Sequence, residues 1–279
     1  MRAGIGRCAH EHGMAKREQA TKPYEQIEGA CKQGKAHYLH QKDGVNHQGG
    51  QAKEGHHHGQ RQWCGTALSS HEVAQGYKDI VDPSVYVRFP LVGEPGTSLL
   101  VWTTTPWTIP SNQALNMHPE VEYALVDTPR GFLILAKDRV EEQLKTYALE
   151  GTIVATARGD ALTEVRFHHP LSKIDAGYAR TSPVYLGDYV TTDTGTGFVH
   201  IAPSHGPDDF VLGRAHNLDV PETVGADGVY TPMVPLFAGL HVFKADKPVC
   251  EKLVAQGALL AQGKLVHAYP HSWRSKAPL

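Results

Sequence analysis

The stretch Leu99-Leu100-Val101-Trp102-Thr103-Thr104-Thr105 is rich in β-branched and aromatic residues and predicts a β-strand, which Pro106 ends. Successive side chains of a strand point to opposite faces, so we expect Thr103 and Thr105 on one face and Thr104 on the other. A threonine hydroxyl at a strand end can hold a ribose, an ester carbonyl or a water, because it both donates and accepts hydrogen bonds. The same composition also fits a strand and loop with no chemical role.

The residues around this strand predict more short strands and a few helices. Two strands, 121–126 and 131–136, form a hairpin around Thr128-Pro129-Arg130. Residues 67–79 form either a short helix or one arm of a hairpin. Further strands are expected at 84–90, 152–158, 164–167, 183–186 and 196–201, and helices at 137–147, 208–216 and 248–256. This pattern predicts a β-rich α/β fold with a barrel-like domain.

The composition bounds the class of protein. The chain has 279 residues, of which 41% are hydrophobic, enough for a packed core. A net charge of −2 gives no global basic field, so any contact with nucleic acid would be local. The four cysteines form no CxxC pair, no apolar run is long enough to cross a membrane, and the N-terminus has no signal-peptide core. We expect a soluble, cytoplasmic protein.

Residues 1–62 differ from the rest of the chain. Their large aliphatic residues are few, and glycine, glutamine, histidine, lysine and glutamate dominate them. Such a segment cannot bury enough apolar surface to offset its chain entropy, so we interpret it as a disordered leader. The histidines His56 to His58 could chelate metal adventitiously, but their spacing matches no usual ligand set.

A second motif spans residues 194–210. It contains Gly195-Thr196-Gly197-Phe198-Val199-His200-Ile201-Ala202-Pro203-Ser204-His205-Gly206-Pro207-Asp208-Asp209. The glycines permit close backbone approach, and Pro207 begins a helix whose dipole stabilises the two carboxylates of its first turn. A carboxylate left free could instead bind an ammonium group. A metal site of His200, His205, Asp208 and Asp209 is a further alternative, although the spacing is not a familiar one.

Taken together, the two motifs resemble the paired signatures of isoleucyl-tRNA synthetase editing domains. The first signature is Trp102-Thr103-Thr104-Thr105-Pro106-Trp107-Thr108-Ile109-Pro110-Ser111-Asn112, and Thr105 replaces the arginine of the valine and leucine enzymes. The turn Gly225-Ala226-Asp227-Gly228-Val229-Tyr230 and the segment 267–278 resemble further parts of the family. The resemblance covers about Trp63 to Leu279.

The resemblance implies a domain organisation. Residues 63–98 would be a linker and strand leading from the synthetase core, 99–265 the editing domain, and 266–279 a truncated return to the core. The nucleotide-binding signatures of the family are absent, and Trp63-Cys64-Gly65-Thr66 lacks half of the usual cysteine pair. Residues 1–62 match nothing expected, and we interpret them as translated out of frame or from unrelated sequence.

The resemblance also implies the activity: hydrolysis of the ester of mischarged Val-tRNA(Ile), without aminoacylation. Asp209 would pair with the α-ammonium group, His200 would limit the size of the side chain, and Thr104 would contact the terminal adenosine and the ester. Thr103, Thr105, Trp107 and Asn112 would bind the substrate. Editing would need no cofactor or metal, and ATP and magnesium would serve only the full-length parent. The partner would be the acceptor end of tRNA(Ile), bound by a monomer.

Two other functions remain open from the sequence. The chain could be a module that binds the tRNA acceptor end without chemistry, or a non-functional gene fragment.

Overall fold

The structure is a computed structural model, which describes residues 70–278. These residues lie within one compact unit of the chain, residues 62–279. The disordered leader predicted for 1–62 and the start of the predicted linker, 63–69, lie outside the described residues.

A six-stranded sheet forms the larger layer, in the order β10-β1-β2-β5-β4-β6. Most neighbours in it are antiparallel, but β2 and β5 run parallel where Thr97–Leu99 lies beside Phe132–Ile134. The predicted hairpin is confirmed as β4 and β5, which pair antiparallel. The strands are β1 (Tyr77–Pro90), β2 (Thr97–Thr103), β4 (Glu122–Asp127), β5 (Phe132–Ala136), β6 (Thr152–Arg158) and β10 (Leu259–Pro270).

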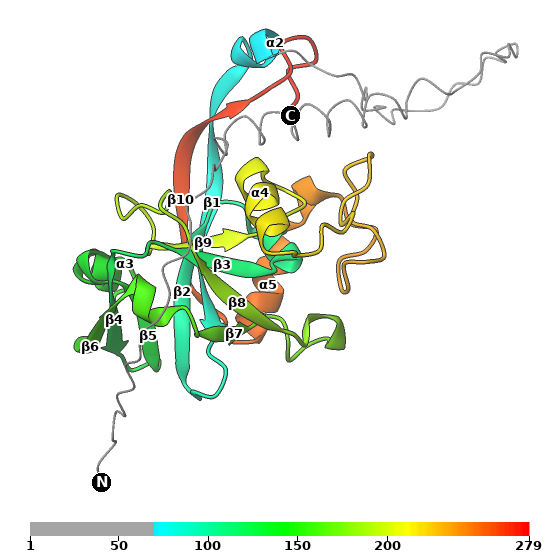
Figure 1. Ribbon diagram of the computed structural model, residues 1–279. Helices are drawn as coiled ribbons and strands as arrows, with labels where there is room; N and C mark the ends of the chain where they lie inside the picture. Colours follow the sequence, from blue (N-terminus) through cyan, green and yellow to red (C-terminus); the bar gives the residue numbers. More distant parts are fainter. Residues whose placement is uncertain (1–69, 279) are drawn as a thin grey trace, which may run out of the picture. The chain divides into compact units, whose positions relative to one another are not determined.

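A four-stranded sheet forms the second layer, in the order β7-β8-β3-β9 (Figure 1). Its strands are β3 (Ala114–Met117), β7 (Arg166–His168), β8 (Thr181–Leu186) and β9 (Phe198–Ile201). An isolated bridge between Leu91 and Phe167 links the two sheets at one corner. The β-rich α/β class is confirmed, but the two mixed sheets do not close into a barrel. Closure would require the edge strands of the two sheets to pair along their lengths.

Short helices fill the connections. The α-helices are α2 (Ser70–Ala74), α3 (Val140–Thr146), α4 (Pro207–Ala215) and α5 (Asp246–Ala255), and the 3₁₀ helices are η1 (Pro106–Ser111), η2 (Lys137–Arg139), η3 (Gly159–Leu162), η4 (Ala176–Tyr178) and η5 (Val242–Lys244). Each of the three longer helices expected from the sequence occurs at its predicted place. In the described part of the chain no helix is long and apolar enough to cross a membrane.

The alternation of residues in β1 and β2 explains the core. Val85, Val87 and Phe89 point to one face and are fully buried among the residues between the sheets. Leu100 points to the other face, where it belongs to a second apolar cluster with residues of β4, β5 and α3. Burial on both faces fits the nearly continuous apolar runs of these strands.

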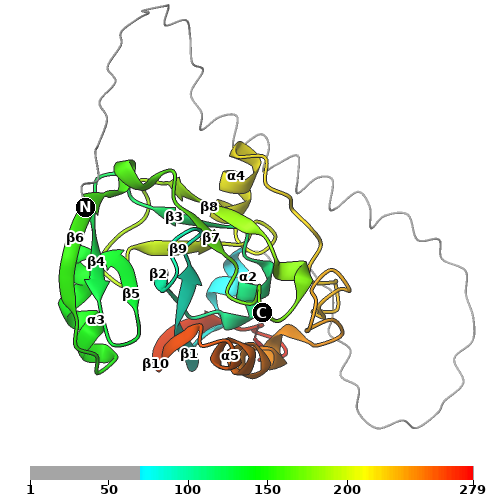
Figure 2. The ribbon, with the colours of Figure 1, turned by 90° about the horizontal axis from the view of Figure 1, so that it is seen from below.

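The long ribbon of β1 and β10 was not expected. Tyr77 pairs with Pro270, and the pairing continues to Val87 and Leu259, so the strands join residues about 180 positions apart. Figure 2 shows α5 packed beside this ribbon. The strand expected at 84–90, in the predicted linker and strand 63–98, therefore extends back to Tyr77 and lies in the larger sheet between β10 and β2. The ribbon also runs on through the predicted boundary at 265/266.

Candidate functional site

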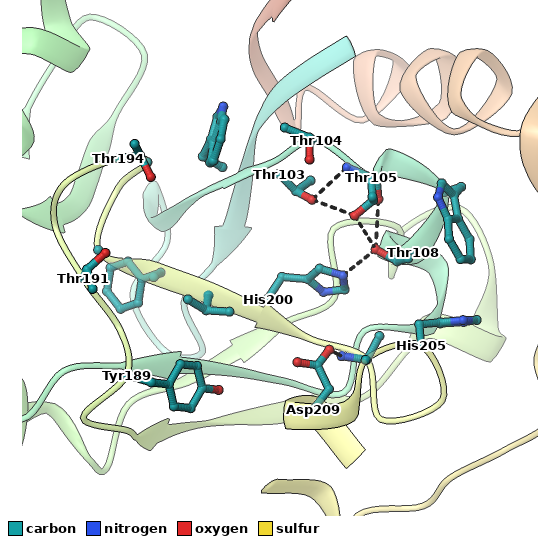
Figure 3. A pocket seen from close by; sticks show the side chains of 18 residues that line it. Thr103, Thr104, Thr105, Thr108, Tyr189, Thr191, Thr194, His200, His205 and Asp209 are labelled. Carbon is teal, nitrogen blue, oxygen red and sulfur yellow. Dashed lines mark hydrogen bonds between the residues drawn. The ribbon is translucent and has the colours of Figure 1, made fainter. Parts of the chain in front are cut away.

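A cavity of about 410 Å³ lies where β2 ends and η1, β9 and the start of α4 meet (Figure 3). The two sequence motifs, some 90 positions apart, form opposite parts of its wall. Six of the seven predicted site residues line it: Thr103, Thr104, Thr105, Trp107, His200 and Asp209. The cavity is within the size range of pockets that hold small ligands.

The threonines meet in a way that the strand pattern did not predict. β2 ends at Thr103, and the backbone amide of Thr105 turns back to donate to Thr103 Oγ1 at 3.1 Å. Because the strand stops there, all three threonines reach the cavity. Thr103 and Thr105 hydroxyls lie 3.1 Å apart, whereas the Thr104 hydroxyl makes no hydrogen bond to any described residue. Thr104 therefore presents an unengaged donor and acceptor.

His200 comes from β9 and is fixed at both ring nitrogens. Asn112 Nδ2 donates to Nδ1 at 3.0 Å, so the ring proton is assigned to Nε2, which lies 2.7 Å from Thr108 Oγ1. Thr108 Oγ1 in turn donates to the carbonyl oxygen of Thr105 at 2.9 Å. Burial, and to a smaller extent the nearby His205, lower the pKa of His200 to about 3. The ring is therefore neutral at pH 7 and acts as a fixed wall, since both nitrogens are engaged.

Asp209 lies in the first turn of α4. Its Oδ2 accepts a hydrogen bond from the backbone amide of Ala202 at 2.8 Å, and its other oxygen has no partner among the described residues (Figure 3). Burial raises the pKa of Asp209, and the bond from Ala202 acts in the opposite direction. A Cβ at position 206 would stand 3.2 Å from the carboxylate carbon, so Gly206 gives the carboxylate its room. One oxygen is thus anchored while the other is available for a cationic ligand.

Asn112 lies outside the cavity wall. It is fully buried, and its Nδ2 donates to the carbonyl oxygen of Ala114 at 2.8 Å as well as to His200. We expected Asn112 to contact the substrate. The structure instead places it behind His200, where it orients the ring.

Gly195 and Gly197 have the tight backbone role that the sequence indicated. Both adopt a positive φ, at 73° and 81°. A Cβ at position 197 would lie 2.5 Å from the Cβ of Ala136, and one at 195 would lie 3.3 Å from the Trp102 ring. These contacts let the loop before β9 lie directly against the end of the larger sheet.

Several cavity residues were missed from the sequence: Thr108, Tyr189, Thr191 and Thr194. His205, which the sequence offered only as part of a metal site, lines the cavity too. Thr108 follows Thr105 by three positions, which in a helical turn puts both on one side, and this signal could have found it. Tyr189, Thr191 and Thr194 belong to the loop before β9, and no local pattern distinguishes them. His205 packs edge-on against Trp107 with ring centroids 4.9 Å apart.

The alternative of a metal site finds no support from side-chain placement. Among residues 70–278, no group of three or more histidine, cysteine, aspartate or glutamate side chains could hold a metal ion.

Comparisons with known proteins relate the whole arrangement to a family. No protein-family model matches the chain. The isoleucine–tRNA ligase of Cupriavidus metallidurans is 61% identical over 236 residues, which cover 77% of this chain and 24% of the ligase. The isoleucine–tRNA ligases of Cupriavidus necator and Ralstonia pickettii are 55% and 51% identical over the same shares. The chain thus spans about a quarter of the relatives that it matches.

The fold has a counterpart of its own among solved structures. The crystal structure of GlLeuRS-CP1, an editing domain of a leucyl-tRNA synthetase, matches with a TM-score of 0.51 at 15% identity. The match covers 64% of this chain and 99% of that one. Over 77% of its length the chain is therefore a relative of isoleucine–tRNA ligases, and the part that the structure describes has the fold of the CP1 editing domain of class I synthetases.

Proposed function

We propose that this chain is an aminoacyl-tRNA ester hydrolase, which removes valine from mischarged Val-tRNA(Ile) and does not aminoacylate. The observation that carries the proposal is the cavity itself. It gathers an anchored carboxylate, a neutral histidine wall and three threonine hydroxyls within a space suited to a small ligand.

Asp209 would bind the α-ammonium group of the esterified amino acid. A carboxylate oxygen without a protein partner makes a strong, charge-assisted hydrogen bond to such a cation. The contact would also place the ester carbonyl, because the ammonium group and the carbonyl carbon are joined through a single carbon atom. Positioning of this kind contributes substantially to the rate of a hydrolysis.

Thr104 would contact the ester or the terminal ribose through its unengaged hydroxyl. Thr103 and Thr105 bond to each other and would support that end of the substrate, with Trp107 beside them. The attacking nucleophile would be a water held among these groups, assisted by a ribose hydroxyl of the substrate. No covalent intermediate, metal or other cofactor is part of the proposal.

His200 would set the size limit. Isoleucyl-tRNA synthetases are a standard case in which a synthetic pocket cannot reject an amino acid smaller by one methylene, and a second, hydrolytic site removes the product. A ring fixed at both nitrogens is suited to exclude the larger isoleucine. The partner would be the acceptor end of tRNA(Ile), bound by a monomer in the cytoplasm, with most of the tRNA affinity supplied by parts of the relatives that this chain does not span.

The decisive experiment is single-turnover deacylation of Val-tRNA(Ile) by an excess of the full chain. We expect hydrolysis above the spontaneous rate. In Asp209→Ala the single-turnover rate should fall at least about 30-fold, because truncating one partner of a charged contact typically costs about 2 kcal/mol or more of binding free energy. Asp208→Ala is the matched control, since Asp208 is the adjacent residue, exposed and outside the cavity wall.

The outcomes separate the rival functions. Binding of the acceptor end without hydrolysis would leave a binding module, and neither binding nor a cooperative unfolding transition would leave a non-functional fragment. Equal loss in Asp208→Ala and Asp209→Ala would remove Asp209 from its role.

A further inference from the structure

The helix η1 is capped by another helix far along the chain. It begins with Pro106, which has no N–H, so Trp107 is the first residue of η1 with an amide to satisfy. Thr105 occupies the N-cap position but makes no capping bond through its side chain. The amide of Trp107 instead donates to Oδ1 of Asp246 at 3.1 Å, across 139 positions.

Because Asp246 caps η1 in place of Thr105, the hydroxyl of Thr105 is free to face the cavity. A threonine at an N-cap ordinarily accepts a bond from an amide of the first helical turn. Here Thr105 Oγ1 lies 3.1 Å from Thr103 Oγ1 and 3.3 Å from Thr108 Oγ1, within the cavity wall. Thr105 can take part in this cluster because Asp246, at the first position of α5, has taken over the cap.

The same residue of η1 is held on its other side. Tyr230 Oη donates to the carbonyl oxygen of Trp107. Thr108 follows directly, and its Oγ1 is the partner of His200 Nε2 at 2.7 Å. A continuous path of hydrogen bonds and backbone therefore runs from α5 to the ring that we propose as the size limit.

We infer that Asp246 is a positioning residue for the hydrolytic cavity, fixing Thr108 and thereby His200 through the backbone of Trp107. The expected effect on deacylation rates rests on the proposed function. The expected effect on the position of η1 rests on the geometry alone. Asp246 does not itself line the first cavity, but it bonds to the backbone of Trp107, which does, and it would not contact the substrate.

The charged carboxylate of Asp246 lowers the stability of the fold, and this supports a role for it beyond packing. It lines a second cavity of about 800 Å³ that also includes Asp82 of β1, Cys250 of α5 and Lys264 of β10. Burial raises the pKa of Asp246 to about 6, which the bond from Trp107 only partly offsets. Retaining a charge where it is poorly solvated weakens folding.

The test compares Asp246→Ala with Asp246→Asn, which keeps an oxygen acceptor, in the full chain. We measure the ratio of deacylation rates for Val-tRNA(Ile) and Ile-tRNA(Ile), and the hydrogen exchange of the Trp107 amide by NMR. We expect Asp246→Ala to lower the ratio by about tenfold and to speed the exchange, in line with loss of a hydrogen bond to a charged group. Asp246→Asn should restore most of both.

Two further variants keep the inference falsifiable. Tyr230→Phe releases the carbonyl of Trp107 without changing α5, and it should lower the ratio in the same direction even where Asp246→Ala fails to fold. Glu251→Ala, on the exposed side of α5, should change neither readout.

The remaining outcomes overturn the inference. They are an unchanged ratio and unchanged exchange in Asp246→Ala, a fall in thermal stability without a fall in the ratio, or no rescue by Asp246→Asn. If the unmodified chain hydrolyses neither ester, the proposed function fails, while the exchange of the Trp107 amide still decides whether Asp246 holds η1.

Discussion

At the scale of single residues, hydrogen bonds decide which groups of the cavity are free to act. His200, Thr103 and Thr105 are all engaged by neighbours, whereas the Thr104 hydroxyl and one oxygen of Asp209 are not. Engaged groups shape the cavity, and unengaged groups meet a ligand without first giving up a bond. The hydrogen bonds thus distinguish residues that position their neighbours from residues that would contact the substrate, although both kinds look alike in the sequence.

Thr104→Val tests the unengaged hydroxyl. The substitution keeps the shape and removes no hydrogen bond of the folded chain, so the midpoint of thermal unfolding should not change. The single-turnover rate of Val-tRNA(Ile) deacylation should fall about tenfold or more, as expected for a lost hydrogen bond in a reacting complex. Thr105→Val is the comparison, because it removes bonds to Thr103 and Thr108 and should also lower thermal stability. An unchanged rate in Thr104→Val would exclude contact between this hydroxyl and the reacting ester.

His200→Ala tests the size limit. Without the ring, the cavity should admit isoleucine, so Ile-tRNA(Ile) should become a substrate. The ratio of the valine and isoleucine rates should fall by about 10- to 200-fold, the range that one methylene can contribute. His216→Ala is the control, because that ring stacks on Tyr185 with centroids 3.7 Å apart and does not line the cavity. Preserved discrimination in His200→Ala would exclude this ring as the gate.

At the scale of elements, the cavity depends on how tightly the loop before β9 meets the larger sheet. Gly197 has a φ of 81°, and its carbonyl oxygen accepts a hydrogen bond from Tyr123 Oη at 2.7 Å. Phe198, at the start of β9, packs against the same tyrosine ring with centroids 4.8 Å apart. The position of His200 two residues later follows from this contact.

Gly197→Ala should therefore destabilise the fold by about 2–4 kcal/mol. About 1–2 kcal/mol comes from the left-handed backbone and the rest from overlap with Ala136, whose Cβ would lie 2.5 Å away. Gly239→Ala separates the two causes, because φ there is 82° but no atom lies within 4 Å of a Cβ. Urea unfolding at pH 7 measures both variants. Equal losses would show that the close approach to Ala136 contributes nothing.

At the scale of the whole molecule, buried histidines make stability depend on pH. Burial lowers the pKa of His169 and His200 to about 3 and that of His205 to about 4. An unfolded histidine titrates near pH 6.5, so below that pH the unfolded chain binds protons that the folded chain does not. Asp246 acts in the opposite sense, because burial raises its pKa to about 6 and the folded chain keeps that proton longer.

The three histidines outweigh Asp246 and Asp209, whose pKa burial also raises, so stability should rise with pH from about 4.5 to 6.5 and level off above 7. The net difference of about two protons corresponds to a slope of about 1–3 kcal/mol per pH unit. Urea unfolding at constant ionic strength measures this slope. His205→Gln should lower the slope by about 1.4 kcal/mol per pH unit, the contribution of one proton. A free energy of unfolding that is constant or falls across this window would contradict the assignment.

The sequence by itself determined the elements whose signals are local. The hairpin of β4 and β5, the helix α4 after Pro207 and the strand β2 stopped before Pro106 all follow from residues within a few positions of one another. The two motifs also predicted one site that contains Thr103 to Thr105, His200 and Asp209, and these residues line one cavity. Each of these predictions depends on the propensity, the periodicity or the motifs of neighbouring residues, which can be read directly from the sequence.

Tertiary structure alone decided what those residues face. It placed Asn112 behind His200 instead of in the cavity, paired β1 with β10, left the sheets open instead of closed as a barrel, and capped η1 with Asp246. The physical reason is distance along the chain. A hydrogen bond from Trp107 to Asp246 crosses 139 positions, and no pattern near either residue records the other.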